Sequence, residues 1–343
     1  MSPMTIRDIA RISEVTVATV SRVINGSPLV KEETQAKVEA VIRENDFVPN
    51  PMARGLSTGV AESVTVILPD ISNPFFAEVV KGISAEAEKF GLTTVLYDTD
   101  ENPRREATAL RNITRHHTRG IIITPVSDSA ASGSTALELM TKRGIPVVLV
   151  DRDTPNSTFD GVFIDNVTGA REAVDALIES GHRKIAVVAG PTDSKPGRER
   201  LAGYQQALEE HGIRMDDRLV LQGDFRLDSG YTETLRLLSE NLGVTAIFSC
   251  NNLMTLGVIK ALREQGIAVP GGMGLVGFDE IPALDILGMP ITHVARPTVE
   301  MGRIALSLLV DQMERGTGDN RLVQRVTLPP ALVRQGSENM NKE

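Results

Sequence analysis

The amino-acid sequence predicts an α/β protein that begins with a small all-helical domain. Residues 1–48 contain three short segments whose apolar side chains recur at helical spacing. From Val64 onward, short apolar runs alternate with amphipathic stretches, a pattern typical of doubly wound parallel sheets with helices on both faces. Between the two patterns lies a segment rich in proline and glycine. We therefore expect a helical domain over 1–48, a linker over 49–60 and a core over 61–343.

The three N-terminal segments each form one apolar face. These faces consist of Ile6, Ile9 and Ala10, then Val20, Val23 and Ile24, then Val38, Val41 and Ile42. Thr5 with Asp8 fits an N-cap with an acid at N3, and Thr16 is placed to cap the second helix. A small helical bundle without special purpose is one interpretation. The other is a helix-turn-helix unit, whose second helix enters the DNA major groove.

The second helix, within "VTVATVSRVING", has an unusual composition that favours DNA binding. Its small side chains would permit deep insertion into the groove. Arg22 can reach a guanine edge, and Val17 and Ala18 can contact a thymine methyl group. Hydroxyl and amide side chains can bind phosphates. The expected DNA-binding residues of this domain are Thr5, Thr16, Val17, Ala18, Thr19, Ser21, Arg22 and Asn25.

The linker "FVPNPMARGLSTG" has two interpretations. It is either a disordered tether or a hinge that becomes helical only on DNA. In the second case Leu56 would insert into the minor groove and kink the duplex.

Charge and cysteine content exclude several classes of protein. The chain has 36 Lys and Arg against 45 Asp and Glu, a net charge of −9, so it is not a generally basic nucleic-acid coat. This net charge does not exclude one local DNA site. Residues 1–60 carry equal numbers of both signs, so their electrostatic signal for DNA binding is weak. The single Cys250 excludes a disulfide framework and a multi-cysteine metal site, and we expect no cofactor. With neither a signal-peptide pattern nor a membrane-spanning run, the sequence predicts a cytoplasmic protein.

Eight apolar strands are predicted in the core. They are Val64–Leu68, Thr93–Tyr97, Gly120–Thr124, Val147–Val150, Val162–Ile164, Ile185–Ala189, Ala246–Ser249 and Gly274–Phe278. So many strands divide into two lobes, with a ligand cleft between the carboxyl ends of the strands. We expect one lobe to comprise about residues 61–160 and 292–320, and the other about 161–291 and 321–340.

Several side chains at the expected strand ends suit a polyhydroxylated ligand. Aromatic walls fit the apolar face of a sugar or a base, and Asp279 can accept hydrogen bonds from two vicinal hydroxyls. Arg198 and Arg200 can bind a ring oxygen, a carboxylate or a phosphate, and Thr124 would line the opposite side. The alternative for each phenylalanine is core packing, and for Asp279 and Arg200 a structural salt bridge. The aromatic candidates are Phe75, Phe76, Phe163, Phe225 and Phe278.

Five motifs in order resemble the lactose/galactose repressor (LacI/GalR) family of bacterial transcription regulators. They are "TIRDIARISEVTVATVSRVING", "VPNPMARGL", "DISNPFFAEVVKGI", "GRERLAGYQQAL" and "LVGFDEI", and the resemblance covers about residues 5–335. It implies a DNA-binding headpiece, a hinge helix and a core similar to periplasmic sugar-binding proteins. It implies a dimer that binds a pseudo-palindromic operator under the control of a small effector. By position, Val17, Ala18 and Arg22 would read bases, Ala53 and Leu56 would enter the minor groove, and Asp279, Arg200, Asn251, Asp151 and Phe225 would contact the effector.

Three positions depart from the family pattern. Glu14 stands in the helix-turn-helix turn where glycine is usual, and we expect it to require a strained backbone. Lys31 replaces a small capping residue, and Gly55 replaces a better helix former. These changes predict weaker DNA binding rather than a different fold.

We therefore expect an effector-controlled, DNA-binding repressor that acts as a homodimer and has no enzymatic activity. The effector is expected to be a sugar or a sugar acid. The alternatives are a soluble sugar-binding receptor, which the N-terminal helices disfavour, and a sugar- or nucleotide-active α/β enzyme, which would need a base or nucleophile in the cleft.

Overall fold

The computed structural model describes residues 4–24, 26–45, 47, 63–113, 118–128, 133–155, 157–315 and 322–340. The chain divides into two compact units, Met1–Ala61 and Glu62–Glu343, each of which is described by itself. Over the described ranges, no helix is both long and apolar enough to cross a membrane.

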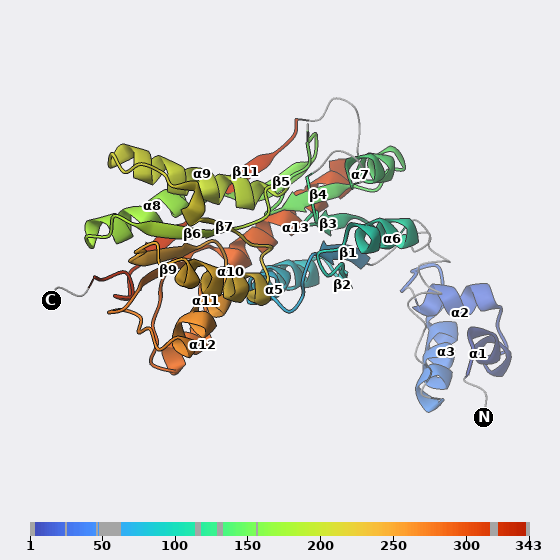
Figure 1. Ribbon diagram of the computed structural model, residues 1–343. Helices are drawn as coiled ribbons and strands as arrows, with labels where there is room; N and C mark the ends of the chain where they lie inside the picture. The colour runs from blue at the N-terminus through green and yellow to red at the C-terminus, as the bar shows by residue number, and fades with distance from the viewer. Residues whose placement is uncertain are drawn as a thin grey trace. The chain divides into compact units, whose positions relative to one another are not determined.

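The first unit contains the three expected helices, α1 (Ile6–Ile12), α2 (Val17–Ile24) and α3 (Glu32–Glu44), coloured blue in Figure 1. They enclose one apolar core, formed by Ile9, Ala10, Val20, Val23, Val38 and Val41. Thr5 begins α1 with a complete capping box: its hydroxyl accepts from the Asp8 backbone N–H, and the Asp8 carboxylate accepts from the Thr5 N–H. Thr16 Oγ1 accepts from the Thr19 N–H, which confirms its predicted place at the start of α2.

The second unit contains two six-stranded sheets, one per lobe. The first sheet is wholly parallel and has the order β11 (Arg325–Leu328), β5 (Asp160–Ile164), β4 (Val147–Val150), β3 (Ile121–Ile123), β1 (Ser63–Leu68), β2 (Thr93–Asp98). The second has the order β12 (Ala331–Val333), β10 (Thr292–Ala295), β9 (Gly274–Phe278), β8 (Ala246–Ser249), β6 (Ile185–Ala189), β7 (Val220–Gln222), with only β12 antiparallel. The eight expected strands are confirmed, and β7, β10, β11 and β12 are additional.

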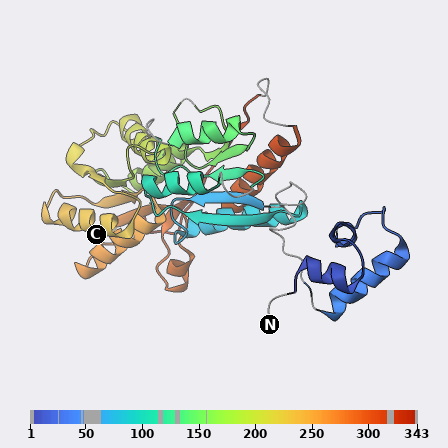
Figure 2. The ribbon, with the colours of Figure 1, turned by 90° about the vertical axis from the view of Figure 1, so that its right-hand side faces the viewer.

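Helices cover both faces of each sheet (Figures 1 and 2). In the first lobe, α5 (Pro74–Lys89) packs with α13 (Thr298–Arg315) on one face, and α6 (Pro103–Ile113) with α7 (Gly133–Lys142) on the other. In the second lobe, α8 (Asn166–Glu179) pairs with α9 (Lys195–Glu210), and α10 (Leu227–Ser239) with α11 (Asn252–Glu264). The short α12 (Pro282–Ile286) follows β9. Both strand orders reverse direction, between β1 and β3 and between β6 and β8, and ligands bind at such switch points.

The chain crosses between the lobes three times, and the lobe boundaries differ from those expected. The crossings follow β5, β10 and β11. We expected β5 and β11 in the second lobe and residues 292–295 in the first, and both expectations are wrong. β5 pairs with β4 and β11 pairs with β5, so both extend the first sheet, whereas β10 pairs with β9 in the second.

Candidate functional site

The first candidate site is the exposed face of α2. Val20 and Val23 point into the core of the headpiece, so the opposite side of the helix faces outward. Thr16, Val17, Ala18 and Arg22 are exposed there, and Thr19 and Ser21 are half-buried. Val17, an apolar residue, is 42% exposed, as a base-contacting side chain would be before it meets DNA. The structure thus places five of the expected DNA-binding residues on α2 and a sixth, Thr16, directly before it.

The turn between α1 and α2 contains the expected strain. Glu14 has a φ of 54°, a left-handed conformation that is costly for a residue with a Cβ. Its carboxylate accepts from Lys37 Nζ on α3 at 2.8 Å, and this hydrogen bond lowers the pKa of Glu14. The charge of Glu14 is therefore paired within the headpiece. Lys31 begins α3 without a side-chain cap.

The remaining DNA-binding candidates are Thr5, Asn25, Ala53 and Leu56. Thr5 is exposed at the start of α1, where its hydroxyl is 2.6 Å from Asp8 Oδ2. Asn25, Ala53, Leu56 and the whole linker over 49–60 lie outside the described residues.

The second candidate site is a cavity between the two lobes of the core. Its lining comes from the loops and first helical turns that follow β1, β2, β4, β6, β7, β8, β9 and β10, so it lies at the carboxyl ends of the strands, as expected. Seven of the ten effector-binding candidates line it: Phe75, Phe76, Asp151, Arg200, Phe225, Asn251 and Asp279. The others in the lining are Asn73, Glu101, Arg152, Pro196 and Arg296. The cavity measures about 20 Å³, enough for a water molecule.

Three expected effector residues do not line this cavity. Arg198 forms an ion pair with Asp128 across the lobes, and its side chain is half exposed. Phe163 packs in the core of the first lobe, with Arg325 over its ring. Thr124 is buried at the end of β3, and its hydroxyl has no hydrogen-bond partner among the described residues. Phe278, the further aromatic candidate, is fully buried, and its ring packs against the guanidinium of the lining residue Arg200.

Arg296 joins the two lobes inside the cavity. It follows β10 on the second crossing, and its Nη1 donates to Asp151 Oδ1 of the first lobe at 2.7 Å. Its Nε donates to Asp279 Oδ1 of the second lobe at 2.5 Å. The guanidinium also lies 3.5 Å from the centre of the Phe75 ring. Asp279 therefore forms a structural salt bridge, which was the alternative to ligand binding that we considered from the sequence. Its partner is Arg296, which the sequence did not point to.

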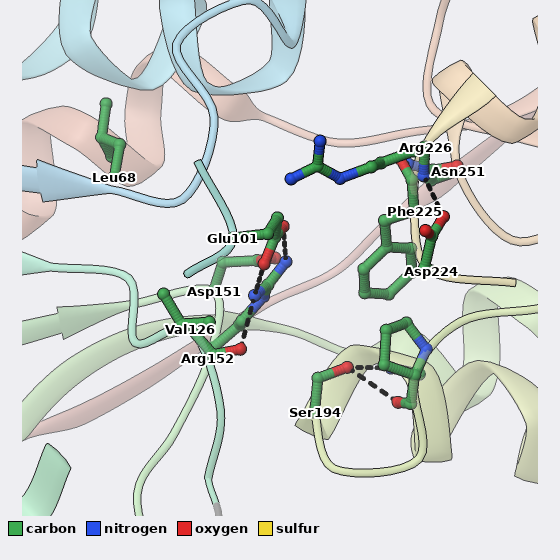
Figure 3. A network of polar contacts seen from close by, with 12 residues as sticks. Leu68, Glu101, Val126, Asp151, Arg152, Ser194, Asp224, Phe225, Arg226 and Asn251 are labelled. Atoms are coloured by element: carbon green, nitrogen blue, oxygen red, sulfur yellow. Dashed lines mark hydrogen bonds and ion pairs between the residues drawn. The ribbon is translucent and has the colours of Figure 1, made fainter. Parts of the chain in front are cut away.

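A second buried ion pair, between Arg152 and Glu101, lies beside Asp151, as Figure 3 shows. Arg152 donates to both carboxylate oxygens of Glu101, at 2.8 and 2.6 Å, and to the carbonyl of Val126 at 2.9 Å. Burial opposes the charge on Arg152, but the Glu101 carboxylate outweighs it, so the pKa of Arg152 is raised. The Phe225 ring of the second lobe lies across from this pair, 5.3 Å from the guanidinium carbon.

Arg200 has a different environment. It is 2% exposed and donates to two neutral oxygens, Asn166 Oδ1 at 2.9 Å and the Cys250 carbonyl at 2.6 Å. Its guanidinium lies 3.8 Å from the centre of the Phe278 ring. In the described part of the chain no carboxylate forms an ion pair with it. Burial, and then repulsion by Arg296, lower the pKa of Arg200 to about 10.

Backbone strain gathers around the cavity. Asp151, Phe225 and Asp279 all have positive φ, at 64°, 67° and 77°, and so does Glu101 at 51°. Non-glycine residues adopt this conformation rarely, and such strain is concentrated at ligand sites.

Further contacts tie the lobes together around the cavity. Asn252 donates to Asn73 Oδ1 at 2.9 Å, and Arg226 donates to the carbonyl of Asp100 at 2.8 Å. Beside the cavity, a groove of about 420 Å³ shares Phe75, Asp279 and Arg296 with it.

Sequence reasoning missed Arg152 and Arg296, and for identifiable reasons. Arg152 directly follows Asp151 at the end of β4, so the same strand-end argument could have found it. Arg296 follows β10, which was not recognised as a strand because the polar Thr292 and His293 interrupt its apolar pattern. Both residues are nevertheless buried, because they are paired with carboxylates.

The fold and these two sites define a class of protein: a DNA-binding regulator with a headpiece and a two-lobed ligand-binding core. Comparisons with known families agree. Residues 5–50 match the model described as "Bacterial regulatory proteins, lacI family", and residues 174–337 match "Periplasmic binding protein-like domain". The chain belongs to the LacI family of bacterial transcription regulators.

Individual relatives match along almost the whole chain. The transcriptional regulator DegA of Bacillus subtilis is 34% identical over 329 residues, 96% of either chain. A structure of the transcriptional regulator CelR in complex with cellobiose is 31% identical and has a TM-score of 0.73, covering 97% of this chain and 99% of that one. The lac repressor dimer bound to operator and an anti-inducer is 25% identical, with a TM-score of 0.83, covering 98% of this chain and 100% of that one.

Proposed function

We propose that this regulator is a repressor whose affinity for operator DNA is set by a polyhydroxylated small molecule, a sugar or a sugar acid, bound between the lobes. The observation that carries the proposal is the convergence of Asp151, Asp279 and Arg200 with Phe75 and Phe225 at the strand ends. Carboxylates accept from hydroxyl groups, a guanidinium donates to oxygens, and aromatic rings pack on the apolar face of a sugar. The CelR complex with cellobiose supports the ligand class.

The mechanism that we propose is a change in the angle between the lobes. A cavity of about 20 Å³ is too small for a sugar, so the lobes have to separate or rearrange to admit one. The three crossings connect the lobes and define where they can bend. In a homodimer this motion would change the distance between the two linkers, residues 49–60, and so the fit of the two headpieces to two half-sites. Such a regulator works on chromosomal DNA, so we place it in the cytoplasm.

The other two candidate functions are less well supported. A solute receptor would not need a headpiece with a face of small and basic residues, such as that of α2. An enzyme would need a general base or nucleophile among the lining residues. Three lining carboxylates, Glu101, Asp151 and Asp279, are instead paired with arginines. We propose that the ligand is bound without being converted.

Two linked measurements test this function. The protein's DNA site is first obtained by selection from random duplexes, and the melting temperature of the protein is measured with pentoses, hexoses, sugar acids, sugar phosphates and nucleosides. A ligand at ~100 times its Kd should stabilise the folded chain by about 2.7 kcal/mol. That ligand should also change the affinity for the selected DNA.

Asp279→Asn should weaken the effect of the ligand on DNA affinity, because the new amide accepts through only one oxygen. Arg263→Gln, an exposed change on α11, should leave it intact. Failure to select any DNA, or DNA binding that no compound in the panel alters, would contradict the proposed function.

A further inference from the structure

We infer that the effector is anionic: a sugar acid or a phosphorylated sugar, and not a neutral sugar. This inference rests on the proposed function and specifies the ligand class of the same cavity. It begins with three arginines, Arg152, Arg200 and Arg296, which line one small cavity although each side chain is almost completely buried. Burying three cations together is unfavourable unless anions accompany them.

The carboxylates of the cavity are already distributed among two of the three cations. Glu101 binds Arg152 through both oxygens. Asp151 and Asp279 both bind Arg296. Among the residues that the structure describes, Arg200 donates only to two carbonyl oxygens, from its Nε to Asn166 and from its Nη1 to Cys250, which leaves its Nη2 for a ligand. Burial, and then repulsion by Arg296, lower the pKa of Arg200 to about 10, and the nearby Asp279 and Asp151 offset this only in part.

Three helices add positive potential at the same place. The N-terminal ends of α5, α9 and α11 supply Asn73, Pro196 and Asn251 to the lining. The helices have 16, 16 and 13 residues, and a helix N-terminus carries the equivalent of roughly half a positive charge. Formal charges among the lining side chains cancel, so the dipoles and the unpaired Arg200 favour a negative ligand.

The same cavity retains acceptors for hydroxyl groups. Arg296 contacts Oδ1 of Asp151 and Oδ1 of Asp279. Across the residues that the structure describes, no donor is bound to Oδ2 of either one, so both atoms can accept from ligand hydroxyls. An anionic group for Arg200 and hydroxyls for the two aspartates define a polyhydroxylated anion.

The test compares matched pairs of ligands by calorimetric titration of the full-length protein. Each set compares a neutral sugar with acids or phosphates derived from it: glucose with gluconate, glucuronate and glucose 6-phosphate, galactose with galacturonate, and ribose with ribose 5-phosphate. We expect at least one anion to bind about tenfold or more tightly than its neutral partner, because a hydrogen bond to a charged group contributes about 1.5–3 kcal/mol. Tighter binding of the sugar acids would identify a carboxylate as the group that Arg200 binds, and tighter binding of the sugar phosphates would identify a phosphate.

Two variants link the preference to Arg200. Arg200→Gln should reduce affinity for the preferred anion about 10- to 100-fold, and should reduce it about tenfold more than it reduces affinity for the neutral partner. Arg263→Gln, which removes an exposed guanidinium from α11, should change neither. If Arg200→Gln fails to fold, Arg200→Lys is used; it retains the charge but loses the planar fork, so the preference for an anion should be reduced but not lost.

Two outcomes overturn the inference, and they differ in what they say about the proposed function. A neutral sugar that binds as tightly as its acid and phosphate would refute an anionic effector and leave a sugar-responsive regulator standing. Binding by no member of the panel, neutral or anionic, would refute both.

Discussion

Gly302 of α13 lies directly against Gly82 of α5. A Cβ built on Gly302 would come within 3.1 Å of the Gly82 Cα and 2.1 Å of the Val79 carbonyl oxygen. The two backbones therefore touch where these helices cross, and this crossing forms one face of the first lobe. Only glycine permits so close an approach.

Gly302→Ala should destabilise the core by about 1–3 kcal/mol or more, because the added methyl group meets backbone atoms that cannot move aside. The melting temperature of the full chain measures this. Ser307→Ala, at an exposed position of the same helix, should be close to neutral. A melting temperature for Gly302→Ala equal to that of Ser307→Ala would show that the helices separate without cost.

Arg152→Met should be strongly destabilising, by about 3 kcal/mol, because it leaves the Glu101 carboxylate without its cation. Urea unfolding measures the loss. The double variant with Glu101→Leu should recover most of it, since both charges are then absent. Arg334→Met, which breaks an exposed ion pair with Glu179, should cost less than about 1 kcal/mol. If Arg152→Met and Arg334→Met lowered the free energy of unfolding equally, the buried ion pair would contribute no more to stability than the exposed one.

Arg296→Gln should weaken the closure of the lobes. Without the guanidinium, Asp151 and Asp279 face each other as like charges from opposite lobes. Small-angle scattering should record a larger radius of gyration, most clearly at low ionic strength. Adding Asp151→Asn should reverse the change. Arg226→Gln, which removes an exposed contact with Asp100, should have a smaller effect. Scattering that is unaltered by Arg296→Gln would show that other contacts determine closure.

Glu106 should make the core less stable as pH rises. Its carboxyl is buried, and burial raises its pKa above the ordinary value of 4.5, although the Val126 N–H and Arg152 oppose this. The folded chain therefore holds this proton more tightly than the unfolded chain does, so its contribution to stability is lost as pH rises from 4.5 through the raised pKa. Glu106→Gln should remove this pH-dependent contribution to stability, because the amide does not titrate. The difference in melting temperature between variant and parent should grow with pH over that range; a constant difference would refute the assignment.

Arg22→Ala should relax DNA sequence specificity. Arg22 is exposed on α2 and can bind a guanine edge through two donors, a contact worth about 1–3 kcal/mol of discrimination. Binding to the selected DNA and to all single-base changes in one half-site measures this. Discrimination should fall at one position. Arg43→Ala, on α3, should leave the pattern of preferences unchanged. A uniform loss across all sequences for Arg22→Ala would instead indicate a phosphate contact.

Sequence patterns were sufficient for the elements with strong periodicity. The helices of the headpiece and the eight central or long strands follow from apolar spacing, and Thr5 and Thr16 begin their helices as expected. The strands that were missed have weak patterns: β7, β11 and β12 are short edge strands, and β10 carries polar residues. Edge strands bury little apolar surface, so their sequences need not alternate.

The position of the cavity could be predicted from the sequence, but the ion pairs among its lining side chains could not. Asp279 and Arg200 were found because each lies at or beyond the end of a predicted strand. Which carboxylate binds which arginine depends on contacts between residues as far apart as Asp151 and Arg296, and no local pattern records them. Arg198 looked equivalent to Arg200 in sequence. They lie two positions apart on α9, however, so their side chains point in different directions, and only Arg200 faces the cavity.

The chain crosses between the lobes three times, and this limits which truncations the core can tolerate. Residues 322–340 supply β11 to one lobe and β12 to the other, and the buried Ser337 and Glu338 also lie within them. A premature stop codon just before this segment would therefore damage both lobes at once. Neither lobe is encoded by one uninterrupted piece of the gene, so no single cut in the sequence separates the two halves of the core.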